Sequence, residues 1–211
     1  MLEFDVDETL RDMKVLHFDC ECRPLAWYGG DFVTKQPTVI SWQWAGAKGK
    51  PKVMAIGESD RSSKVVEEER EMVEAFTAVY NQADVVTGHF IRGFDLPLVN
   101  ASRINLGLTP LEDKLTSDTK NDFVRRHGMS MSQENLGAVF EMEHPKVPSN
   151  NLLWERANML IPSGIKWAKS RCVGDVVQHM ELRTKMLAQN LLAPPQEWSS
   201  QSKGGTGKYH A

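Results

Sequence analysis

A short apolar segment that runs directly into two carboxylates constrains the fold of this chain most strongly. Residues 14–20 (KVLHFDC) are mainly apolar, which predicts a short strand that is buried on both faces at the centre of a sheet. Asp19 and Glu21 lie at the predicted end of this strand. Because side chains alternate across a strand, both carboxylates project from one face, and Cys20 and Cys22 project from the other. The two acids therefore reach the same place in the fold.

The remaining hydrophobic patterns place this strand in a mixed sheet. Residues 38–45 and 52–56 are rich in β-branched and aromatic side chains on either side of a turn, which predicts a hairpin. Antiparallel strands followed by alternating strands and helices predict an α/β fold, a mixed sheet flanked by helices. The other expected elements are helices over 63–82, 96–105 and 132–140, strands over 84–89 and 115–119, and a long helical pattern over 166–192 that begins or breaks near Gly174.

Length and composition favour one folded domain. The chain has 211 residues, of which 41% are hydrophobic, and this is enough to bury a core. We expect an N-terminal arm over residues 1–13, the domain over 14–193, and a disordered tail over 194–211, which lacks apolar periodicity. The formal net charge of −3 neither indicates nor excludes a local basic groove for nucleic acid.

Cysteine usage and hydropathy indicate the compartment. Three cysteines cannot all pair, and Cys20-x-Cys22 has no second pair to complete a zinc site, so reduced thiols are expected. No signal-peptide pattern opens the sequence, and no apolar run approaches the roughly 18 residues of a membrane span. These features predict a soluble, cytoplasmic protein without a membrane partner.

Two further acids lie in settings that need an explanation. Asp95 comes just before Leu96-Pro97, where an acid that caps the following helix is one interpretation. Asp175 lies among valines on a helix face that should point to the core. Because an unpaired buried carboxylate costs several kcal/mol, Asp175 is expected to pair with a cation or bind a metal. The same holds for Asp19 and Glu21, whose repulsion a Lys, an Arg or a divalent metal would offset.

Three segments together resemble a known family. FDCE at 18–21, GHFIRGFD at 88–95 and CVGD at 172–175 are similar, in order and spacing, to the three exonuclease motifs of the DEDD family of 3′–5′ exonucleases. Members of that family have a ribonuclease H-like fold. The resemblance spans roughly residues 14–190 and is closest to the exonuclease domains of family B DNA polymerases. Residues 115–119 and the helix expected at 132–140 also resemble the segment between the second and third motifs.

The resemblance implies a specific chemistry. Asp19, Glu21, Asp95 and Asp175 would be the catalytic carboxylates and would hold two divalent ions, Mg²⁺ or Mn²⁺. Two such ions activate a water and relieve charge on the leaving oxygen during phosphodiester hydrolysis. Both ions prefer hard oxygen ligands. The implied function is a metal-dependent 3′–5′ exonuclease that acts on single-stranded 3′ ends of DNA, with proofreading for a separate polymerase as one role that would fit.

The sequence departs from the family at one position. The family carries a Tyr four residues, or a His five residues, before the last Asp, where it orients the attacking water. Arg171 and Ser170 occupy those positions here, and an Arg stays protonated. His179, one turn after Asp175, is a candidate auxiliary residue, although it also fits an ordinary helix face.

Substrate contacts are less specific. Trp27 and Tyr28 are candidates for stacking on a terminal base, whereas Trp42 and Trp44 have the spacing of core residues in a strand. Arg92 and Lys146 are candidates for phosphate contacts, as are Arg103, Arg125 and Arg126, although all of these also fit a solvated surface. His89 lies beside the second motif and could approach the scissile phosphate.

Two other functions fit the same residues. The missing Tyr or His favours a catalytically weak or inactive nucleic-acid-binding module that partners a polymerase, and the four acids favour an enzyme. An RNA-directed exonuclease fits as well, because the sequence does not distinguish DNA from RNA. A ribonuclease H-like endonuclease fits less well, because the second motif is that of the exonucleases.

Overall fold

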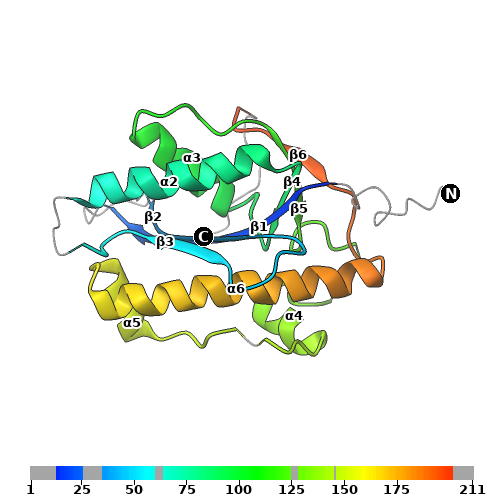
Figure 1. Cartoon of the computed structure of the whole chain (residues 1–211). Helices are drawn as coiled ribbons and strands as arrows, with labels where there is room; N and C mark the ends of the chain where they lie inside the picture. The colour runs from blue at the N-terminus through cyan, green and yellow to red at the C-terminus, as the bar shows by residue number, and fades with distance from the viewer. Residues whose placement is uncertain (1–12, 26–34, 60–63, 125–127, 145, 202–211) are drawn as a thin grey trace.

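A six-stranded mixed sheet forms the centre of the molecule, in the order β3-β2-β1-β4-β5-β6 (Figure 1). The computed structural model describes residues 13–25, 35–59, 64–124, 128–144 and 146–201. The strands are β1 (Val15–Pro24), β2 (Lys35–Trp44), β3 (Lys52–Ala55), β4 (Val85–Gly88), β5 (Lys114–Asp118) and β6 (Gln196–Trp198). The helices are α2 (Val65–Gln82), α3 (Asp95–Asn105), α4 (Gln133–Val139), α5 (Asn151–Asn158) and α6 (Pro162–Ala188).

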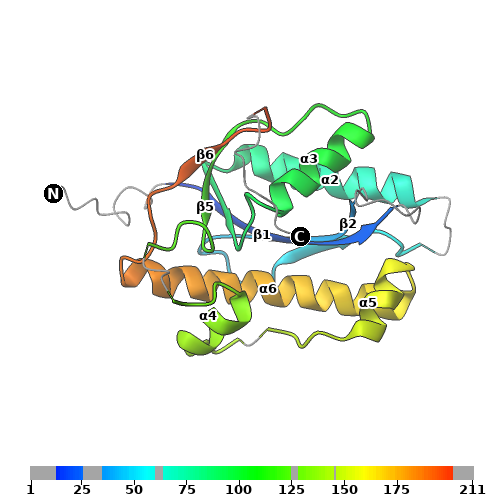
Figure 2. The same cartoon turned by 180° about the vertical axis from the view of Figure 1, so that it is seen from behind.

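Both sheet orientations occur, as the order of the elements predicts. β1 pairs antiparallel with β2 and parallel with β4, and β5 continues the parallel part. Helices α2 and α3 cover one face of the sheet, while α4, α5 and α6 lie on the other, as both views show (Figure 1 and Figure 2). The prediction of an α/β fold with a mixed sheet flanked by helices is confirmed.

Strand β1 separates two cores. Leu16, Phe18 and Cys20 point to the α2 face, where they pack with Phe76 and Tyr80. On the opposite face a second apolar cluster joins β2 and β3 to α5 and α6. Leu16, Phe18 and Cys20 are thus buried under α2, and the side chains of Asp19 and Glu21 are directed toward α6.

Several expected boundaries were wrong. Strand β1 continues to Pro24, beyond the carboxylates, because β2 pairs with it as far as Lys35. Helix α6 begins at Pro162 and passes through Gly174 without a break. The short helix α5 was not predicted; Asn150 caps it by accepting a hydrogen bond from the Leu153 N–H.

The expectation of a disordered tail from residue 194 is also wrong for its first part. Residues 196–198 form β6, which pairs antiparallel with the edge of β5. Ser200 Oγ then donates to the Leu111 carbonyl at 2.9 Å. Backbone pairing orders this polar segment, because β5 offers it unpaired edge groups. Residues 1–12 of the N-terminal arm expected over 1–13, and residues 202–211, lie outside the described residues.

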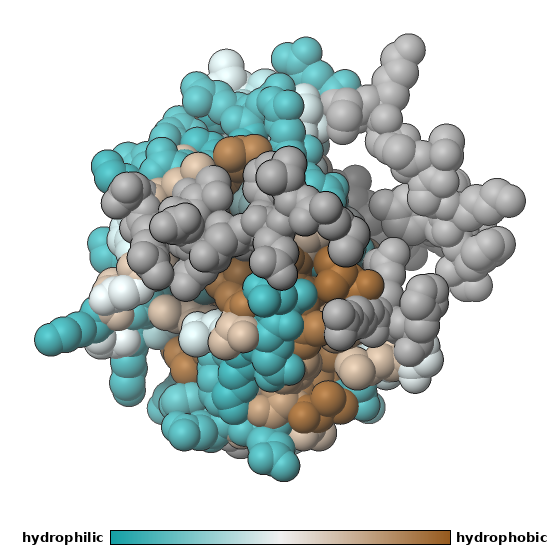
Figure 3. Space-filling view, turned by 90° about the vertical axis from the view of Figure 1, so that its right-hand side faces the viewer, coloured by the Kyte–Doolittle hydropathy of each residue, from teal (hydrophilic) through white to brown (hydrophobic). Residues whose placement is uncertain are grey.

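The surface carries scattered apolar side chains. On the face in Figure 3, hydrophobic residues gather mainly near the centre, and hydrophilic residues lie toward the rim. Exposed apolar residues of this kind are ordinary for a folded domain. Within the described part of the chain, no helix combines the length and hydrophobicity needed to span a membrane.

Candidate metal centre

Three carboxylates from two distant segments meet between β1 and α6. Asp19 and Glu21 come from β1, and Asp175 comes from the middle of α6; one oxygen of each lies within 4.8 Å of the others. Helix α6 is held on this strand by direct contact, since Cys172 Sγ donates to the Asp19 carbonyl at 3.2 Å. We call Asp19, Glu21 and Asp175 the acidic cluster.

Asp95 lies beside the acidic cluster but is not one of the three grouped residues. It is the first residue of α3, is buried, and accepts a hydrogen bond from the Cys20 N–H through Oδ1 at 2.8 Å. Phe94 occupies the N-cap position and makes no side-chain cap bond, so the capping interpretation of Asp95 is wrong. Of the four expected metal ligands, the structure therefore brings three together. The fourth, Asp95, is hydrogen-bonded to the backbone of β1, the strand that carries Asp19 and Glu21.

Crowding and burial make ionisation of these acids costly. Burial, followed by the charges of Asp95, Asp175 and Glu21, raises the pKa of Asp19 well above its usual range. Burial and the nearby Asp175 raise the pKa of Glu21 to about 8. Burial raises the pKa of Asp95 to about 7, against the stabilising Cys20 N–H. The carboxylates need positive charge nearby in order to be ionised together at neutral pH.

Two side chains supply part of that charge. Lys146 Nζ lies 3.3 Å from Asp175 Oδ2. Arg171 Nε lies 3.2 Å from Glu21 Oε1 and 3.9 Å from Asp175 Oδ2. Burial raises the pKa of Asp175, and both cations oppose this increase. Lys146 was expected to contact phosphate, and Arg171 stands where the family has its Tyr; the structure places both at the acidic cluster.

The donor set fits a hard divalent cation. Asp175 is buried, and no described residue hydrogen-bonds to its Oδ1 atom. A buried carboxylate oxygen without a partner is costly unless a ligand satisfies it. The thiols do not compete, because burial raises the pKa of Cys20 and Cys172 well above the usual value and keeps them protonated. Oxygen ligands of this kind suit Mg²⁺ or Mn²⁺.

The two histidines that were expected near the reaction are engaged by other residues. Both ring nitrogens of His89 are engaged: Nδ1 lies 3.0 Å from Thr119 Oγ1, and Nε2 lies 2.9 Å from the Met131 carbonyl. His179 is buried against His17 of β1, with the two Nδ1 atoms 3.1 Å apart. Burial lowers the pKa of His89 to about 4 and that of His179 well below its usual value. The structure gives both residues partners other than the acidic cluster.

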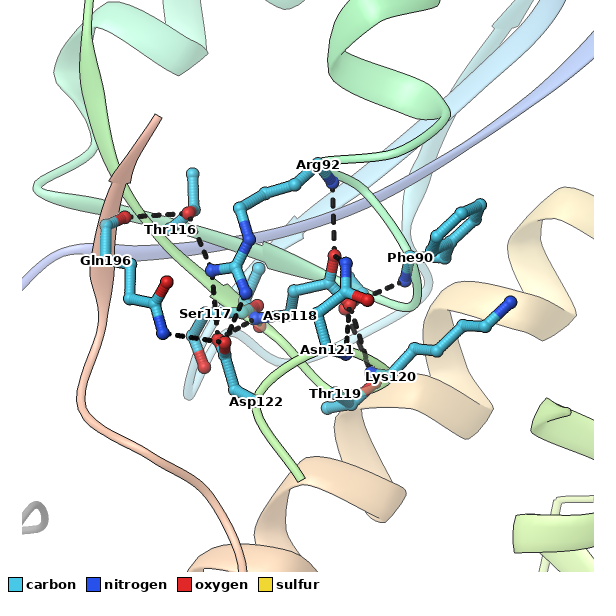
Figure 4. Close-up of polar contacts among 12 residues, drawn as sticks. Phe90, Arg92, Thr116, Ser117, Asp118, Thr119, Lys120, Asn121, Asp122 and Gln196 are labelled. Carbon is cyan, nitrogen blue, oxygen red and sulfur yellow. Dashed lines mark hydrogen bonds and ion pairs between the residues drawn. The ribbon is translucent and has the colours of Figure 1, made fainter. Parts of the chain in front are cut away.

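Arg92 belongs to a structural network at the ends of β4 and β5. Its guanidinium forms a bidentate ion pair with the buried Asp122, and it also contacts Thr116 Oγ1 at 3.2 Å (Figure 4). Asp118 accepts hydrogen bonds from the backbone N–H groups of Phe90 and Arg92. The network holds the loop between β4 and α3, which carries the second motif. The proposed phosphate contact would require Arg92 to leave Asp122.

The other candidates for substrate contact are either internal or outside the described residues. Trp42 is buried in the core and Trp44 packs against it, as their strand spacing predicts. Trp27, Tyr28, Arg125 and Arg126 lie outside the described residues. Arg103 is also internal, since it donates to the Thr109 carbonyl and to Thr77 Oγ1 at 2.7 Å each.

Residues that the sequence analysis did not single out complete the site. Trp154 and Trp167 stack in a T-shaped pair with centroids 4.9 Å apart, and the Arg171 guanidinium lies over both rings. The pair joins α5 to α6. Because α5 was not predicted, the only available signal was the presence of two tryptophans near the third motif.

Comparison with known proteins extends the description of the fold. No protein-family model matches the sequence, and no curated protein matches it significantly. One of the matching solved structures is that of the family B DNA polymerase from the hyperthermophilic archaeon Pyrobaculum calidifontis. The likeness has a TM-score of 0.51 at 17% identity and covers 83% of this chain. The chain spans about a quarter of that polymerase, since the match covers 24% of its length. At this identity the likeness concerns the fold, a mixed α/β sheet consistent with the ribonuclease H-like architecture.

Proposed function

We propose that this chain is a divalent-metal-dependent 3′–5′ exonuclease that acts on single-stranded ends of DNA. One observation carries the proposal: Asp19 and Glu21 of β1 and Asp175 of α6 each have an oxygen within 4.8 Å of the others, and Asp175 Oδ1 is buried with no hydrogen-bond partner among the described residues. The order of the three sequence motifs and the fold shared with a family B DNA polymerase support the same assignment.

In this proposal, each residue of the site has a separate role in binding the metal or the substrate. Asp19, Glu21 and Asp175 would hold the metal, and Asp95 would complete the set. When bound, the metal supplies Lewis-acid stabilisation of charge at the phosphodiester and an activated water. Lys146 keeps part of its side chain in solvent, at 18% exposure, so its ammonium can meet a phosphate of the substrate.

At the positions where the family carries a Tyr or a His, this chain has no side chain that can act as a general base. Arg171 stays protonated and is tied to Glu21. His179 is buried against His17. Turnover would therefore depend on the metal more than it does in relatives that carry the Tyr or His, and a modest rate is expected.

A second candidate is a nucleic-acid-binding module without catalysis, acting beside a separate polymerase. The contacts of Lys146 and Arg171 with the acidic cluster favour it, because two cations already offset part of the acids' repulsion. Such a module would bind single-stranded DNA and leave it intact.

A degradation assay separates the two candidates. A 5′-labelled DNA strand is incubated with the protein and Mg²⁺ or Mn²⁺, and the same strand with a blocked 3′ end and an RNA strand of the same sequence are run in parallel. The proposal predicts a ladder that shortens by single nucleotides, is lost with EDTA and is lost on 3′ blocking.

Variants tie the activity to the site. Asp19→Asn and Asp175→Asn should abolish degradation, while Glu74→Gln, an exposed acid on α2, should match the wild type. Binding of an uncut strand by the wild-type protein would instead support the non-catalytic module. Equal degradation by Asp175→Asn and the wild type would refute the assigned site.

A further inference from the structure

Arg171 is a fixed cation within the acidic cluster. It lies one helical turn before Asp175 on α6, and its Nε atom is 3.2 Å from Glu21 Oε1. Its Nη1 atom donates to the Val147 carbonyl at 2.6 Å, and its guanidinium lies 5.6 Å and 5.9 Å from the ring centroids of Trp154 and Trp167. The side chain is only 10% exposed. A guanidinium held by an ion pair, a carbonyl and two indoles has several interactions to lose if it moves.

Lys146 adds a second positive charge from a neighbouring segment. It directly precedes Val147, whose carbonyl fixes Arg171, so one stretch of chain positions both cations. Lys146 Nζ lies 3.3 Å from Asp175 Oδ2, the oxygen that Arg171 also faces at 3.9 Å. The other oxygen, Oδ1, has no hydrogen-bond partner among the described residues. The two oxygens of Asp175 thus have different surroundings, one facing cations and the other without a partner.

The charge balance of the site follows from these contacts. Asp19, Glu21, Asp95 and Asp175 carry four negative charges when ionised. Lys146 and Arg171 offset two of them and leave two, which is the charge of a single divalent ion. We propose, on the basis of the proposed function, that the free protein binds one divalent ion at this site, and that Lys146 and Arg171 supply the positive charge of a second. This differs from the two ions per site that the family resemblance implies.

Counting bound Mn²⁺ tests this directly. The full chain is titrated with Mn²⁺, and free ion is measured by electron paramagnetic resonance while heat is measured by calorimetry. The wild-type protein should bind one Mn²⁺ per chain. Removing either cation by Lys146→Gln or Arg171→Gln should raise the Mn²⁺ affinity by about tenfold, since each charge lies near the acids at low effective dielectric. The double variant should bind a second ion.

A matched control separates this effect from a general change in charge. Lys169 lies on α6 two residues before Arg171, but it pairs with Glu58 and not with the acidic cluster. Lys169→Gln removes the same charge from the same helix and should leave the stoichiometry and affinity of the wild type. Thermal melting of each variant checks folding, and Lys146→Gln, whose residue is partly exposed, keeps the test valid if Arg171→Gln fails to fold.

The possible results distinguish this inference from the proposed function. Two Mn²⁺ ions bound by the wild-type protein would overturn the inference and leave the proposed function standing. No Mn²⁺ bound at millimolar concentrations would refute the metal site and hence both proposals. A single ion with wild-type affinity in both Lys146→Gln and the double variant would show that the cations do not take the place of a second ion.

Discussion

The imidazoles of His17 and His179 meet edge-on across the interface of β1 and α6, with centroids 5.2 Å apart and Nδ1 atoms 3.1 Å apart. Both rings are buried, and Arg183 adds an unfavourable charge for protonation of either one. Burial is the larger cause, and it lowers the pKa of His17 to about 3. A hydrogen bond between the two Nδ1 atoms needs one ring to donate and the other to accept, so at least one of the two rings must be neutral.

This histidine pair should make the protein sensitive to acid. Because its pKa values are lower in the folded state than the ordinary value of 6.5, the unfolded chain takes up protons that the folded chain does not. The contribution of the pair to stability is constant above about pH 6.5 and falls as the pH decreases toward about 3, by up to about 1.4 kcal/mol per pH unit for each histidine. Urea unfolding between about pH 7 and pH 5 measures this slope.

The double variant His17→Gln, His179→Gln isolates the pair's contribution. Glu21 and Asp95 have raised pKa values, so their contribution to the stability of the folded protein decreases as the pH rises. This pH dependence is opposite to that of the histidine pair. Glu21 and Asp95 are present in both the wild type and the double variant, so their effect cancels when the two pH slopes are compared. The variant should therefore have a smaller loss of stability in acid; an identical slope would show that the histidines do not control it.

The acidic cluster should cost the metal-free protein stability. In EDTA, Asp19→Asn should raise the free energy of unfolding by about 1 kcal/mol, because an amide of the same shape removes the repulsion that raises the pKa of Asp19. With excess Mg²⁺ the order should reverse, since the wild-type protein binds the ion and the variant has lost a ligand. Chemical denaturation in both buffers checks this, and destabilisation of Asp19→Asn in EDTA would argue against it.

Arg92 should matter for stability, although the sequence suggested a role at the substrate. Arg92→Met leaves the buried Asp122 carboxylate without its bidentate partner and should destabilise the protein by about 3 kcal/mol. Arg70→Met, which removes an exposed ion pair with Glu74 and a hydrogen bond to the Leu106 carbonyl, should cost under about 1 kcal/mol. Equal stability of Arg92→Met and the wild type, together with weaker DNA binding, would restore the substrate role.

Strand β6 should contribute to the fold. Truncation after Ala193 removes its pairing with β5 and the partly buried Trp198, which packs against the main core. We expect a loss of about 2 kcal/mol relative to a chain truncated after Gln201, which retains the strand. Coincident melting curves for the two truncated chains would show that β6 adds nothing.

Local sequence pattern was enough to place the acids on one side of a central strand. The alternation of side chains in β1 directs Asp19 and Glu21 to the same face, and the valines around Asp175 indicated that this carboxylate needs a cation or a metal. That Asp175 joins Asp19 and Glu21 was implied by the resemblance to the exonuclease motifs. The α/β class followed from the order of strands and helices. These features depend on periodicity within a few residues, and periodicity can be read from one sequence.

Features that depend on distant partners were not predictable in this way. His89 is engaged by Thr119 and Met131, and Arg92 by Asp122, each about 30 residues or more along the chain. The same holds for Asp95, whose acceptor role depends on the Cys20 N–H of another strand. Helix α5 is short, and its packing on α6 rather than its own pattern stabilises it. At these positions the sequence identifies a candidate residue, but it does not show which distant residue that side chain contacts in the fold.

The location of a bound metal tests the central claim most directly. Crystals of the full chain soaked in Mn²⁺ can be measured at a wavelength where manganese scatters anomalously. We predict an anomalous peak within ligand distance of Asp19 and of Asp175 Oδ1, and its loss in crystals of Asp175→Asn. Two results would contradict the metal centre and the nuclease function that depends on it. One is a manganese peak elsewhere; the other is an acidic cluster that, in the presence of Mn²⁺, contains no manganese and is neutralised only by Lys146 and Arg171.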